Sequence, residues 1–373
     1  ANARDLDAGR ESGLSSALMD RLALDSGRVA AMAAGVREIV ALPDPVGEVI
    51  DGFRLPNGLD VRKVRVPLGV VAVVYEARPN VTIDAAALAL KSGNAIVLRG
   101  SSSAAHSNAV LARVAIEAAE AAGLPSGSLA LVAGGGREEL AELAGQEGVV
   151  DLIIPRGGEG LKAALKEHAT VPVMYAAAGN CHVFVDASAN LDDAAAITLN
   201  AKVQRPSVCN AAETLLVHAD VAGEFVPRVL RELREKGVEL RVDGRTRSVA
   251  GALADSLADA SEEDWETEYH ALILAVKVVD TAEEAIEHVN RYGSGHSEAI
   301  VTGSTESARE FTDGVDAACV YVNASTRFTD GAVFGMGAEI GNSTQKLHAR
   351  GPIALRELTT YKFVIEGSGQ VRE

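Results

Sequence analysis

Residues Gln204–Asn210, with the sequence QRPSVCN, place a cysteine in a polar and basic setting. Pro206 fixes its own φ angle and disfavours the helical conformation at Arg205. Arg205 and the nearby Lys202 are expected to bring positive charge close to Cys209, and positive charge lowers the pKa of a thiol. A free cysteine is most often a small buried hydrophobic side chain. The setting of Cys209 favours a nucleophile instead, with backbone N–H groups following it for a developing oxyanion.

Two other stretches carry polar side chains just after predicted strands. Asn80 follows Arg78-Pro79, and its amide is either an oxyanion donor or an ordinary turn asparagine. Arg99 precedes Ser101–Ser103 at the predicted start of a helix. This arrangement is either a phosphate site that uses helix N–H groups, or a simple helix cap with a surface arginine.

A third stretch combines hydroxyl groups with one arginine. Ser325, Thr326 and Arg327 form either a site for an anionic substrate or a hydrophilic loop. The histidines of the chain show no metal-ligand spacing, and we predict no metal site. Neither the G-x-G-x-x-G fingerprint nor the phosphate-loop motif occurs in the sequence, so no motif assigns a nucleotide.

The elements that position these residues form an alternating pattern. Residues 17–42 are predicted to be one helix, which Pro43 and Pro45 end. Residues 49–68 predict a β-hairpin around Asn57-Gly58. From Gly69 the chain alternates apolar strands with helices, a pattern typical of a doubly wound parallel sheet. A second block of the same kind begins at residue 183, and ligands of such sheets lie at the carboxyl ends of the strands.

Composition limits the classes of function. The 373 residues carry 35 basic and 52 acidic side chains, a net charge of −17, which argues against nonspecific nucleic-acid binding. Three cysteines argue against a disulfide framework and for a reducing compartment. No apolar run is long enough to span a bilayer, and we expect a cytoplasmic protein. The chain starts at Ala1 without methionine, which suggests that some N-terminal sequence precedes it.

Several stretches together resemble the gamma-glutamyl phosphate reductases (glutamate-5-semialdehyde dehydrogenases), a branch of the aldehyde dehydrogenase superfamily. The similarity runs from about residue 66 to the end. The stretches that carry it include VPLGVVAVVYEARPNVTIDAAALALKSGNAIVLRG, DLIIPRGGEGL, GNCHVFVD, QRPSVCNAAETLLVH, YGSGHSEAIVTG, YVNASTRFTDG and GMGAEIGNSTQKLHARGPIALREL.

The resemblance implies reduction of L-glutamyl 5-phosphate with NADPH to L-glutamate 5-semialdehyde and phosphate, a step of proline biosynthesis. Cys209 aligns with the nucleophile of the family, which forms a thioester. Asn80 and the backbone N–H of Cys209 are implied as the oxyanion hole. The residues implied for the cofactor are Arg99, Ser101, Ser102, Gly157, Gly158 and Glu268. Those expected to bind the substrate are Arg205, His296, Ser297, Ser325, Thr326 and Arg327.

One departure from the superfamily concerns residues 176–179, of sequence AAAG. Hydrolytic aldehyde dehydrogenases carry there a glutamate that activates water to cleave the thioester. Its replacement fits an enzyme whose acyl acceptor is phosphate, because water must not compete. We therefore expect no appreciable oxidation of aldehyde to free acid.

The resemblance also implies an aldehyde-dehydrogenase-like fold with two α/β domains and an oligomerisation element. We predict a cofactor-binding domain of residues 1–49, 68–182 and 346–359, and a catalytic domain of residues 183–345. The hairpin 50–67 and the tail 360–373 would form the oligomerisation element of a homo-oligomer. Functional coupling to the upstream glutamate kinase is a further expectation.

The sequence leaves other functions open. A different acylating aldehyde dehydrogenase on the same fold would share Cys209 but accept another acyl group. A catalytically silent scaffold would keep the fold without needing Cys209, Asn80 and Arg99 together. A cysteine hydrolase would turn over without nicotinamide, but no histidine is tied to Cys209 by the sequence.

Overall fold

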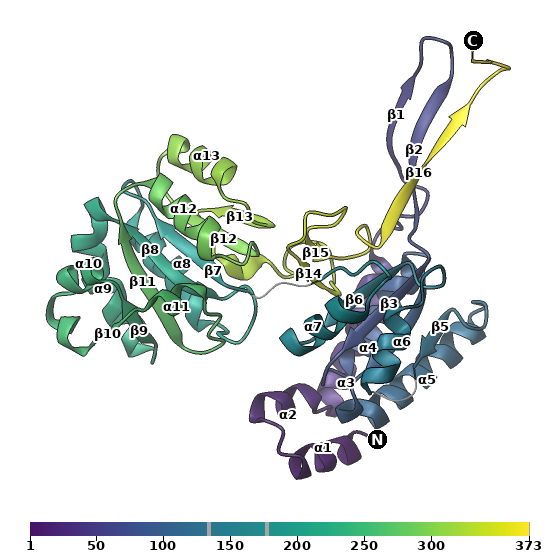
Figure 1. The fold of residues 1–373 in the computed structure, drawn as a ribbon, viewed down its shortest axis with the longest axis horizontal. Coiled ribbons are helices and arrows are strands. Elements are labelled where there is room, and N and C mark those ends of the chain that lie inside the picture. Colours follow the sequence, from purple (N-terminus) through teal and green to yellow (C-terminus); the bar gives the residue numbers. More distant parts are fainter. Residues whose placement is uncertain (133–135, 176–178, 373) are drawn as a thin grey trace. The chain divides into compact units, whose positions relative to one another are not determined.

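The computed structural model describes residues 1–132, 136–175 and 179–372. The chain divides into two compact units (Figure 1). Unit 1 comprises Ala1–Ala176, Gly335–Gly341 and Gln345–Glu373, and unit 2 comprises Ala177–Phe334 and Asn342–Thr344. The described part of the chain holds no helix long and apolar enough to cross a membrane.

Unit 1 is built on a four-stranded parallel sheet of order β5-β4-β3-β6. Its strands are β3 (Val70–Tyr75), β4 (Ala95–Gly100), β5 (Leu129–Leu131) and β6 (Leu152–Arg156). Successive residues of a strand face opposite sides of a sheet. Val71 and Val73 therefore pack on one face with α3 (Ser26–Ala41), α4 (Asn80–Lys91) and α5 (Ala105–Ala121). Ala72 and Val74 pack on the other face with α6 (Arg137–Ala144) and α7 (Glu159–His168). This double burial explains the continuous apolar run VVAVVY.

The helices of unit 1 are α1 (Asn2–Glu11), α2 (Ser16–Leu22), α3 (Ser26–Ala41), α4 (Asn80–Lys91), α5 (Ala105–Ala121), α6 (Arg137–Ala144) and α7 (Glu159–His168). The single helix predicted for residues 17–42 was wrong, because the chain breaks between α2 and α3. The side chain of Asp25 accepts a hydrogen bond from the N–H of Arg28 at 2.7 Å and caps the start of α3.

A three-stranded antiparallel sheet belongs to the same unit. The hairpin of β1 (Val49–Arg54) and β2 (Asp60–Pro67) pairs with the C-terminal strand β16 (Thr359–Glu366) along β2. The hairpin turns at Gly58, whose φ angle of 89° favours glycine. The predicted hairpin is thus present, and the C-terminal tail completes its sheet.

Unit 2 holds a seven-stranded sheet of order β10-β9-β11-β8-β7-β12-β13, with every neighbouring pair parallel. The strands are β7 (Cys181–Val185), β8 (Ala212–His218), β9 (Glu239–Val242), β10 (Ala258–Asp259), β11 (Ile273–Val279), β12 (Ser297–Val301) and β13 (Cys319–Val322). The helices are α8 (Leu191–Val203), α9 (Ala219–Glu235), α10 (Gly244–Val249), α11 (Glu262–Glu266), α12 (Ala282–Tyr292) and α13 (Thr305–Gly314).

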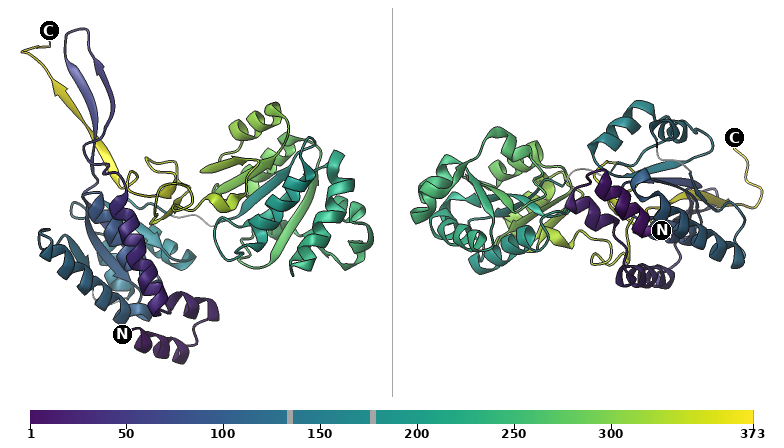
Figure 2. Two further views of the ribbon diagram at one scale, coloured as in Figure 1. Left: turned by 180° about the vertical axis from the view of Figure 1, so that it is seen from behind. Right: turned by 90° about the horizontal axis from the view of Figure 1, so that it is seen from below.

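The sheet of unit 2 is covered on both faces, as the views of Figure 2 show. Val183 and Val185 pack on α8 and α9, and the intervening Phe184 packs on α12 and α13. The remaining strands are β14 (Gly341–Ser343) and β15 (Gly351–Ile353). Two parallel α/β sheets and a separate hairpin confirm the predicted fold class. The residue boundaries of the predicted domains stay a prediction.

Candidate active site

Cys209 lies in unit 2, in the loop 204–211 between the end of α8 and the start of β8. It is a free cysteine and only partly buried. The thiol of Cys181 donates to the carbonyl oxygen of Cys209 at 3.2 Å. Gly179 passes so close that a Cβ atom there would lie 1.7 Å from the same carbonyl oxygen. Only glycine fits at residue 179, and the backbone of Cys209 is held from two sides.

The loop that follows β13 fastens the residues on either side of Cys209. Asn210 is buried and donates through Nδ2 to the carbonyl oxygen of Thr329 at 2.8 Å. Thr326 donates from its hydroxyl to the carbonyl oxygen of Asn210 at 2.6 Å. Nε of Arg327 donates to Oε1 of Gln204 at 2.9 Å. The hydroxyl of Thr326, predicted to meet the substrate, thus holds the nucleophile loop.

Arg327 is a cationic residue of this loop and interacts electrostatically with Cys209. Burial lowers the pKa of the Arg327 guanidinium, while the charges of Asp330 and Cys209 act to raise it. The charge of the exposed Arg205 acts to lower it further. The same attraction favours the thiolate of Cys209, because the interaction of two charges is mutual.

His296, Ser297 and Ser325 are buried beside the same loop. Nδ1 of His296 lies 2.8 Å from the hydroxyl of Ser297, which lies 2.6 Å from the hydroxyl of Thr329. The hydroxyl of Ser325 accepts from the N–H of Arg327 at 3.3 Å. The structure joins these residues to the nucleophile loop through hydrogen bonds within the unit, and their contact with substrate stays a prediction.

Lys202, which is expected to lend positive charge to Cys209, is the partner of a buried carboxylate. Lys202, on α8, is completely buried and forms a salt bridge with the equally buried Glu213 on β8. Burial raises the pKa of Glu213 to about 7, and Lys202 counteracts this rise. The charge of Lys202 is therefore used by Glu213, and the pair joins the two elements between which the nucleophile loop lies.

Glu268 follows α11 in a loop that Glu213 also contacts. Its side chain is 14% exposed, and Oε2 lies 3.3 Å from Nε2 of His270. The N–H of His270 donates to Oε1 of Glu213 at 3.3 Å. Through Glu213, the buried ion pair thus connects the segment that contains Glu268 to the start of β8, where the nucleophile loop ends.

The other predicted residues lie in unit 1, at the carboxyl ends of its parallel strands. Asn80 is exposed at the start of α4, directly after β3, and its Nδ2 donates to Oδ2 of Asp84 at 3.0 Å. Burial raises the pKa of Asp84, and the hydrogen bond from Asn80 counteracts this rise. An exposed amide with a fixed orientation is what an oxyanion donor requires.

Arg99 lies near the end of β4 and is buried, with 6% exposure. Its Nη2 donates to the carbonyl oxygen of Gly136 at 2.5 Å, and its buried Nε has no hydrogen-bond partner among the described residues. Burial lowers the pKa of Arg99, and the charges of Glu139 and Glu76 counteract this. Ser101 and the exposed Ser102 follow after Gly100, and the hydroxyl of Ser101 accepts from the N–H of Ala77 at 3.2 Å.

Gly157 and Gly158 join β6 to α7 beside the same strand ends. The N–H of Gly158 donates to Oε2 of Glu76 at 3.0 Å. A Cβ atom on Gly157 would lie 2.7 Å from the carboxyl carbon of Glu76. The structure therefore places Arg99, Ser101, Ser102 and the two glycines at the carboxyl ends of the strands, around Glu76.

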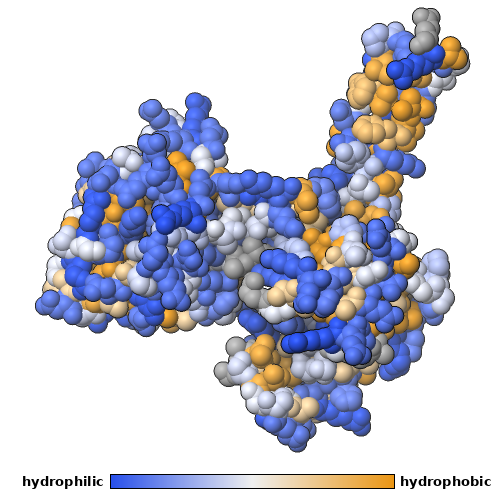
Figure 3. All heavy atoms as spheres, in the orientation of Figure 1, coloured by the Kyte–Doolittle hydropathy of each residue, from blue (hydrophilic) through white to orange (hydrophobic). Residues whose placement is uncertain are grey.

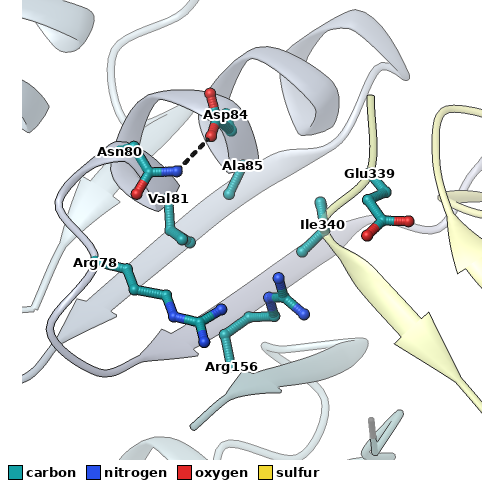
Figure 4. Close-up of a pocket in the computed structure, with 8 residues that line it drawn as sticks. All are labelled: Arg78, Asn80, Val81, Asp84, Ala85, Arg156, Glu339 and Ile340. Carbon is teal, nitrogen blue, oxygen red and sulfur yellow. Dashed lines mark hydrogen bonds between the residues drawn. The ribbon is translucent and has the colours of Figure 1, made fainter. Parts of the chain in front are cut away.

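A pocket in unit 1 contains residues that we did not predict from the sequence. Arg78 and Arg156 line it together with Asn80, Asp84 and Glu339 (Figure 4). Its apolar wall is formed by Val81, Ala85 and Ile340. The signal was present in the sequence, because both arginines stand at the ends of predicted strands, in Arg-Pro-Asn and Pro-Arg-Gly-Gly.

The candidate residues thus form two groups, one on each unit. Asn80 and the predicted cofactor residues other than Glu268 belong to unit 1, and the remaining candidates surround Cys209 in unit 2. Among the described residues, no group of histidine, cysteine, aspartate and glutamate side chains is arranged to hold a metal ion. Residues 176–178, where the hydrolytic glutamate is expected to be missing, lie outside the described residues.

Comparison with known proteins assigns this architecture to a family. The sequence profile of the aldehyde dehydrogenase family matches residues 24–258 and 256–364. The chain belongs to the aldehyde dehydrogenase family, whose members use NAD or NADP.

Within it, the chain belongs with the gamma-glutamyl phosphate reductases. It is 57% identical over 373 residues to the enzyme of that name from Moorella thermoacetica, covering 100% of this chain and 88% of the relative. The corresponding enzyme of Syntrophomonas wolfei is 55% identical over 372 residues, with the same coverage. The crystal structure of gamma-glutamyl phosphate reductase from Thermotoga maritima superposes with a TM-score of 0.96 at 48% identity, covering 100% of this chain and 89% of that one.

Proposed function

We propose that this chain reduces L-glutamyl 5-phosphate to L-glutamate 5-semialdehyde and phosphate, a step of proline biosynthesis. The observation that carries the proposal is Cys209, partly exposed in a loop whose backbone is fastened on both sides and whose thiol interacts with Arg327. The similarity to gamma-glutamyl phosphate reductases over the full length of the chain supports this substrate.

The proposed roles follow from the chemistry of an acyl phosphate. The thiolate of Cys209 forms a bond to the acyl carbon, the bond from that carbon to the phosphate oxygen breaks, and a thioester remains. Asn80 and the backbone N–H of Cys209 donate to the oxyanion that develops on the acyl oxygen. A nicotinamide cofactor, when bound, would supply the hydride that takes the thioester to the aldehyde level. Cys209 then leaves as the thiolate, which Arg327 stabilises.

The residues at the strand ends of unit 1 fit a nucleotide. Arg99 is a buried cation with an Nε that has no partner in the described ranges, and such an unsatisfied donor is costly unless a ligand binds it. We propose that Arg99, Ser101 and Ser102 hold the adenosine ribose and its 2′-phosphate, that Gly157 and Gly158 leave room for the cofactor, and that Glu268 holds the nicotinamide ribose. The expected cofactor is therefore NADPH rather than NADH.

The variant Arg99→Gln tests the preference for NADPH. Loss of one hydrogen bond to a charged group should lower kcat/KM with NADPH about 10- to 100-fold and leave kcat/KM with NADH within about twofold. Equal losses with the two cofactors would contradict contact with the 2′-phosphate.

We also propose that the chain forms a homo-oligomer through the sheet β1-β2-β16. Apolar side chains gather on this sheet, as Figure 3 shows. The exposed ones are Val49, Ile50, Phe53, Tyr361, Phe363 and Ile365. Because β1 and β16 are edge strands, their unpaired backbone groups favour pairing with another chain. Light scattering at micromolar concentration should give at least the mass of a dimer, and a mass of 38.7 kDa would contradict the proposal.

We also propose that this chain is functionally coupled to the upstream glutamate kinase. An acyl phosphate is labile in water, so transfer directly from the enzyme that forms it would protect it. Addition of the kinase should then raise the yield of semialdehyde from glutamate and ATP above that calculated for free diffusion.

The reaction is best tested in reverse, with glutamate semialdehyde and NADP, by following reduced nicotinamide with and without inorganic phosphate. We expect reduction of NADP that depends on phosphate and is lost in Cys209→Ala by at least about 10³-fold, as for other nucleophiles. Turnover without phosphate would indicate a hydrolytic dehydrogenase and overturn the prediction of no free acid. Activity that survives in Cys209→Ala would remove the proposed nucleophile.

A further inference from the structure

Two arginines meet in the pocket of unit 1 because of the register of its strands. β3 pairs with β6 so that Tyr75 lies opposite Arg156. Arg156 ends β6, and Arg78 follows Tyr75 by three residues, just before α4. Figure 4 shows both side chains directed into one space, with Asn80 and Asp84 on the side of α4. None of the roles assigned above uses either arginine.

Arg156 is built into the unit rather than projecting from its surface. Its Nε is buried and finds no hydrogen-bond partner within the described ranges. A Cβ atom on Gly341 would lie 2.8 Å from Nη1 and 3.2 Å from Cδ of Arg156. The glycine therefore leaves room for a guanidinium that is closely packed yet keeps an unsatisfied donor, which is costly unless a ligand satisfies it.

The size and chemistry of the pocket indicate a small oxyanion. Its volume is about 160 Å³. A water molecule takes about 30 Å³ of liquid, so the pocket accepts a group of several heavy atoms. Guanidinium groups offer planar, forked donors that match the oxygens of phosphate and carboxylate. Asn80 lines the same pocket, and its proposed role as oxyanion donor indicates whether phosphate or carboxylate binds there.

In an acyl phosphate, a single bridging oxygen joins the carbonyl carbon to phosphorus. A side chain that holds the carbonyl oxygen must therefore have the phosphate group immediately beside it. The α-carboxylate of a glutamyl group lies at the other end of the molecule, several bonds away. With Asn80 as the oxyanion donor, the neighbouring cations are placed for phosphate rather than for that carboxylate.

We propose that Arg156 and Arg78 bind the phosphate group of the acyl phosphate beside Asn80, and bind inorganic phosphate in the reverse reaction. This inference rests on the proposed function. When the thiolate of Cys209 bonds to the acyl carbon, the carbon–oxygen bond to phosphate breaks and its electron pair leaves on the phosphate oxygen. The two guanidinium groups neutralise the charge that collects there.

The carboxylates of the pocket serve the release of the product. Asp84 and Glu339 stand beside the arginines and repel a phosphate dianion, which offsets part of the attraction. A site of two arginines without acidic neighbours would hold inorganic phosphate tightly and slow turnover. Asp84 has a second use, because its Oδ2 accepts from Nδ2 of Asn80 and orients the amide.

The test measures the KM of each substrate in the reverse reaction, with inorganic phosphate as the probe. Arg156→Gln should raise the KM for phosphate about 10- to 100-fold, the effect of losing hydrogen bonds to a charged group. The KM values for semialdehyde and NADP should stay within about twofold. Arg156→Lys, which keeps the charge but not the fork, should give a smaller rise.

Two further variants serve as a control and a substitute. Arg113→Gln removes an exposed arginine of α5 that pairs with Glu117, and it should leave all three KM values unchanged. Gly341→Ala displaces the Arg156 guanidinium without removing it. It should also raise the KM for phosphate, so that the inference is tested even if Arg156→Gln does not fold.

An unchanged KM for phosphate in both Arg156→Gln and Gly341→Ala would overturn the inference. So would a rise confined to the KM for semialdehyde, which would assign the arginines to the carboxylate, or one confined to NADP. If wild-type turnover does not depend on phosphate, the proposed function itself fails. If it does depend on phosphate while these variants keep the wild-type KM, only the present inference fails.

Discussion

Two sets of buried charged side chains, one in each unit, are in opposite states. Beneath the nucleophile loop of unit 2, Lys202 and Glu213 are completely buried and paired with each other. At the strand ends of unit 1, the buried Nε atoms of Arg99 and Arg156 have no hydrogen-bond partner within the described ranges. Paired charges hold their own unit together, whereas donors left without a partner are suited to a ligand.

The difference matches what each region must do. A thiolate attacks along one direction, so its loop must be fixed before substrate arrives, and internal hydrogen bonds achieve this. The groups that receive phosphate or cofactor need their donors available. Substitutions of the buried ion pair in unit 2 should therefore appear first in stability, and those of the two arginines in unit 1 first in the kinetics of one substrate.

The largest effect on stability is expected at the buried pair. Lys202→Met leaves the carboxylate of Glu213 buried without its cation, which should lower the free energy of unfolding by about 3–5 kcal/mol. The double variant Lys202→Met/Glu213→Leu removes both charges and should recover most of this loss. Urea unfolding can be followed by fluorescence of Trp265, the single tryptophan of the chain, which lies in unit 2.

The outcome of the double variant also separates two roles of the pair. If stability returns but kcat stays low, the pair positions the nucleophile loop and the Glu268 segment as well as stabilising unit 2. A loss below about 1 kcal/mol in Lys202→Met, which is the range of exposed salt bridges, would contradict the comparison between the units.

Sequence reasoning predicted the parts of the molecule that depend on local pattern. The alternation of apolar strands with helices predicted both α/β blocks, and Asn57-Gly58 predicted the turn of the hairpin. It did not predict the ion pair of Lys202, because a lysine near a cysteine suggests charge for the thiol. Its actual partner, Glu213, lies 11 residues away on the strand beyond the loop.

Arg156 was missed for a similar reason. In Pro-Arg-Gly-Gly the glycines marked a ligand site, but the meeting of Arg156 with Arg78 depends on the pairing of β3 with β6. The break between α2 and α3 depends on a single cap, that of Asp25, within an otherwise helical stretch. The pairing of strands is decided by tertiary structure, which composition and periodicity do not report, whereas the cap at Asp25 is a local signal that the helical pattern around it obscured.

A smaller effect, confined to catalysis, is expected at Asn80. Asn80→Ala removes an exposed amide, so the free energy of unfolding should change by no more than about 0.5 kcal/mol. If the amide stabilises the oxyanion, kcat should fall about 10²- to 10³-fold, as for other oxyanion donors. Asn80→Ser, which keeps a donor, should lose less. Steady-state kinetics beside thermal unfolding by circular dichroism would check this, and a loss of stability without loss of kcat would assign Asn80 to the turn.

The smallest expected effect has the opposite sign and tests the balance of charge in unit 1. Asp84→Asn removes a negative charge from the pocket, while the new side-chain oxygen can still accept from Nδ2 of Asn80. The KM for inorganic phosphate in the reverse reaction should therefore fall by about threefold to tenfold. Two like charges that face each other in a solvent-accessible pocket repel by about 1 kcal/mol. A fall in Asp84→Asn beside a rise in Arg156→Gln would show that charge in this pocket sets phosphate affinity. A KM that rises in both variants would instead mean that the two residues only maintain the shape of the pocket.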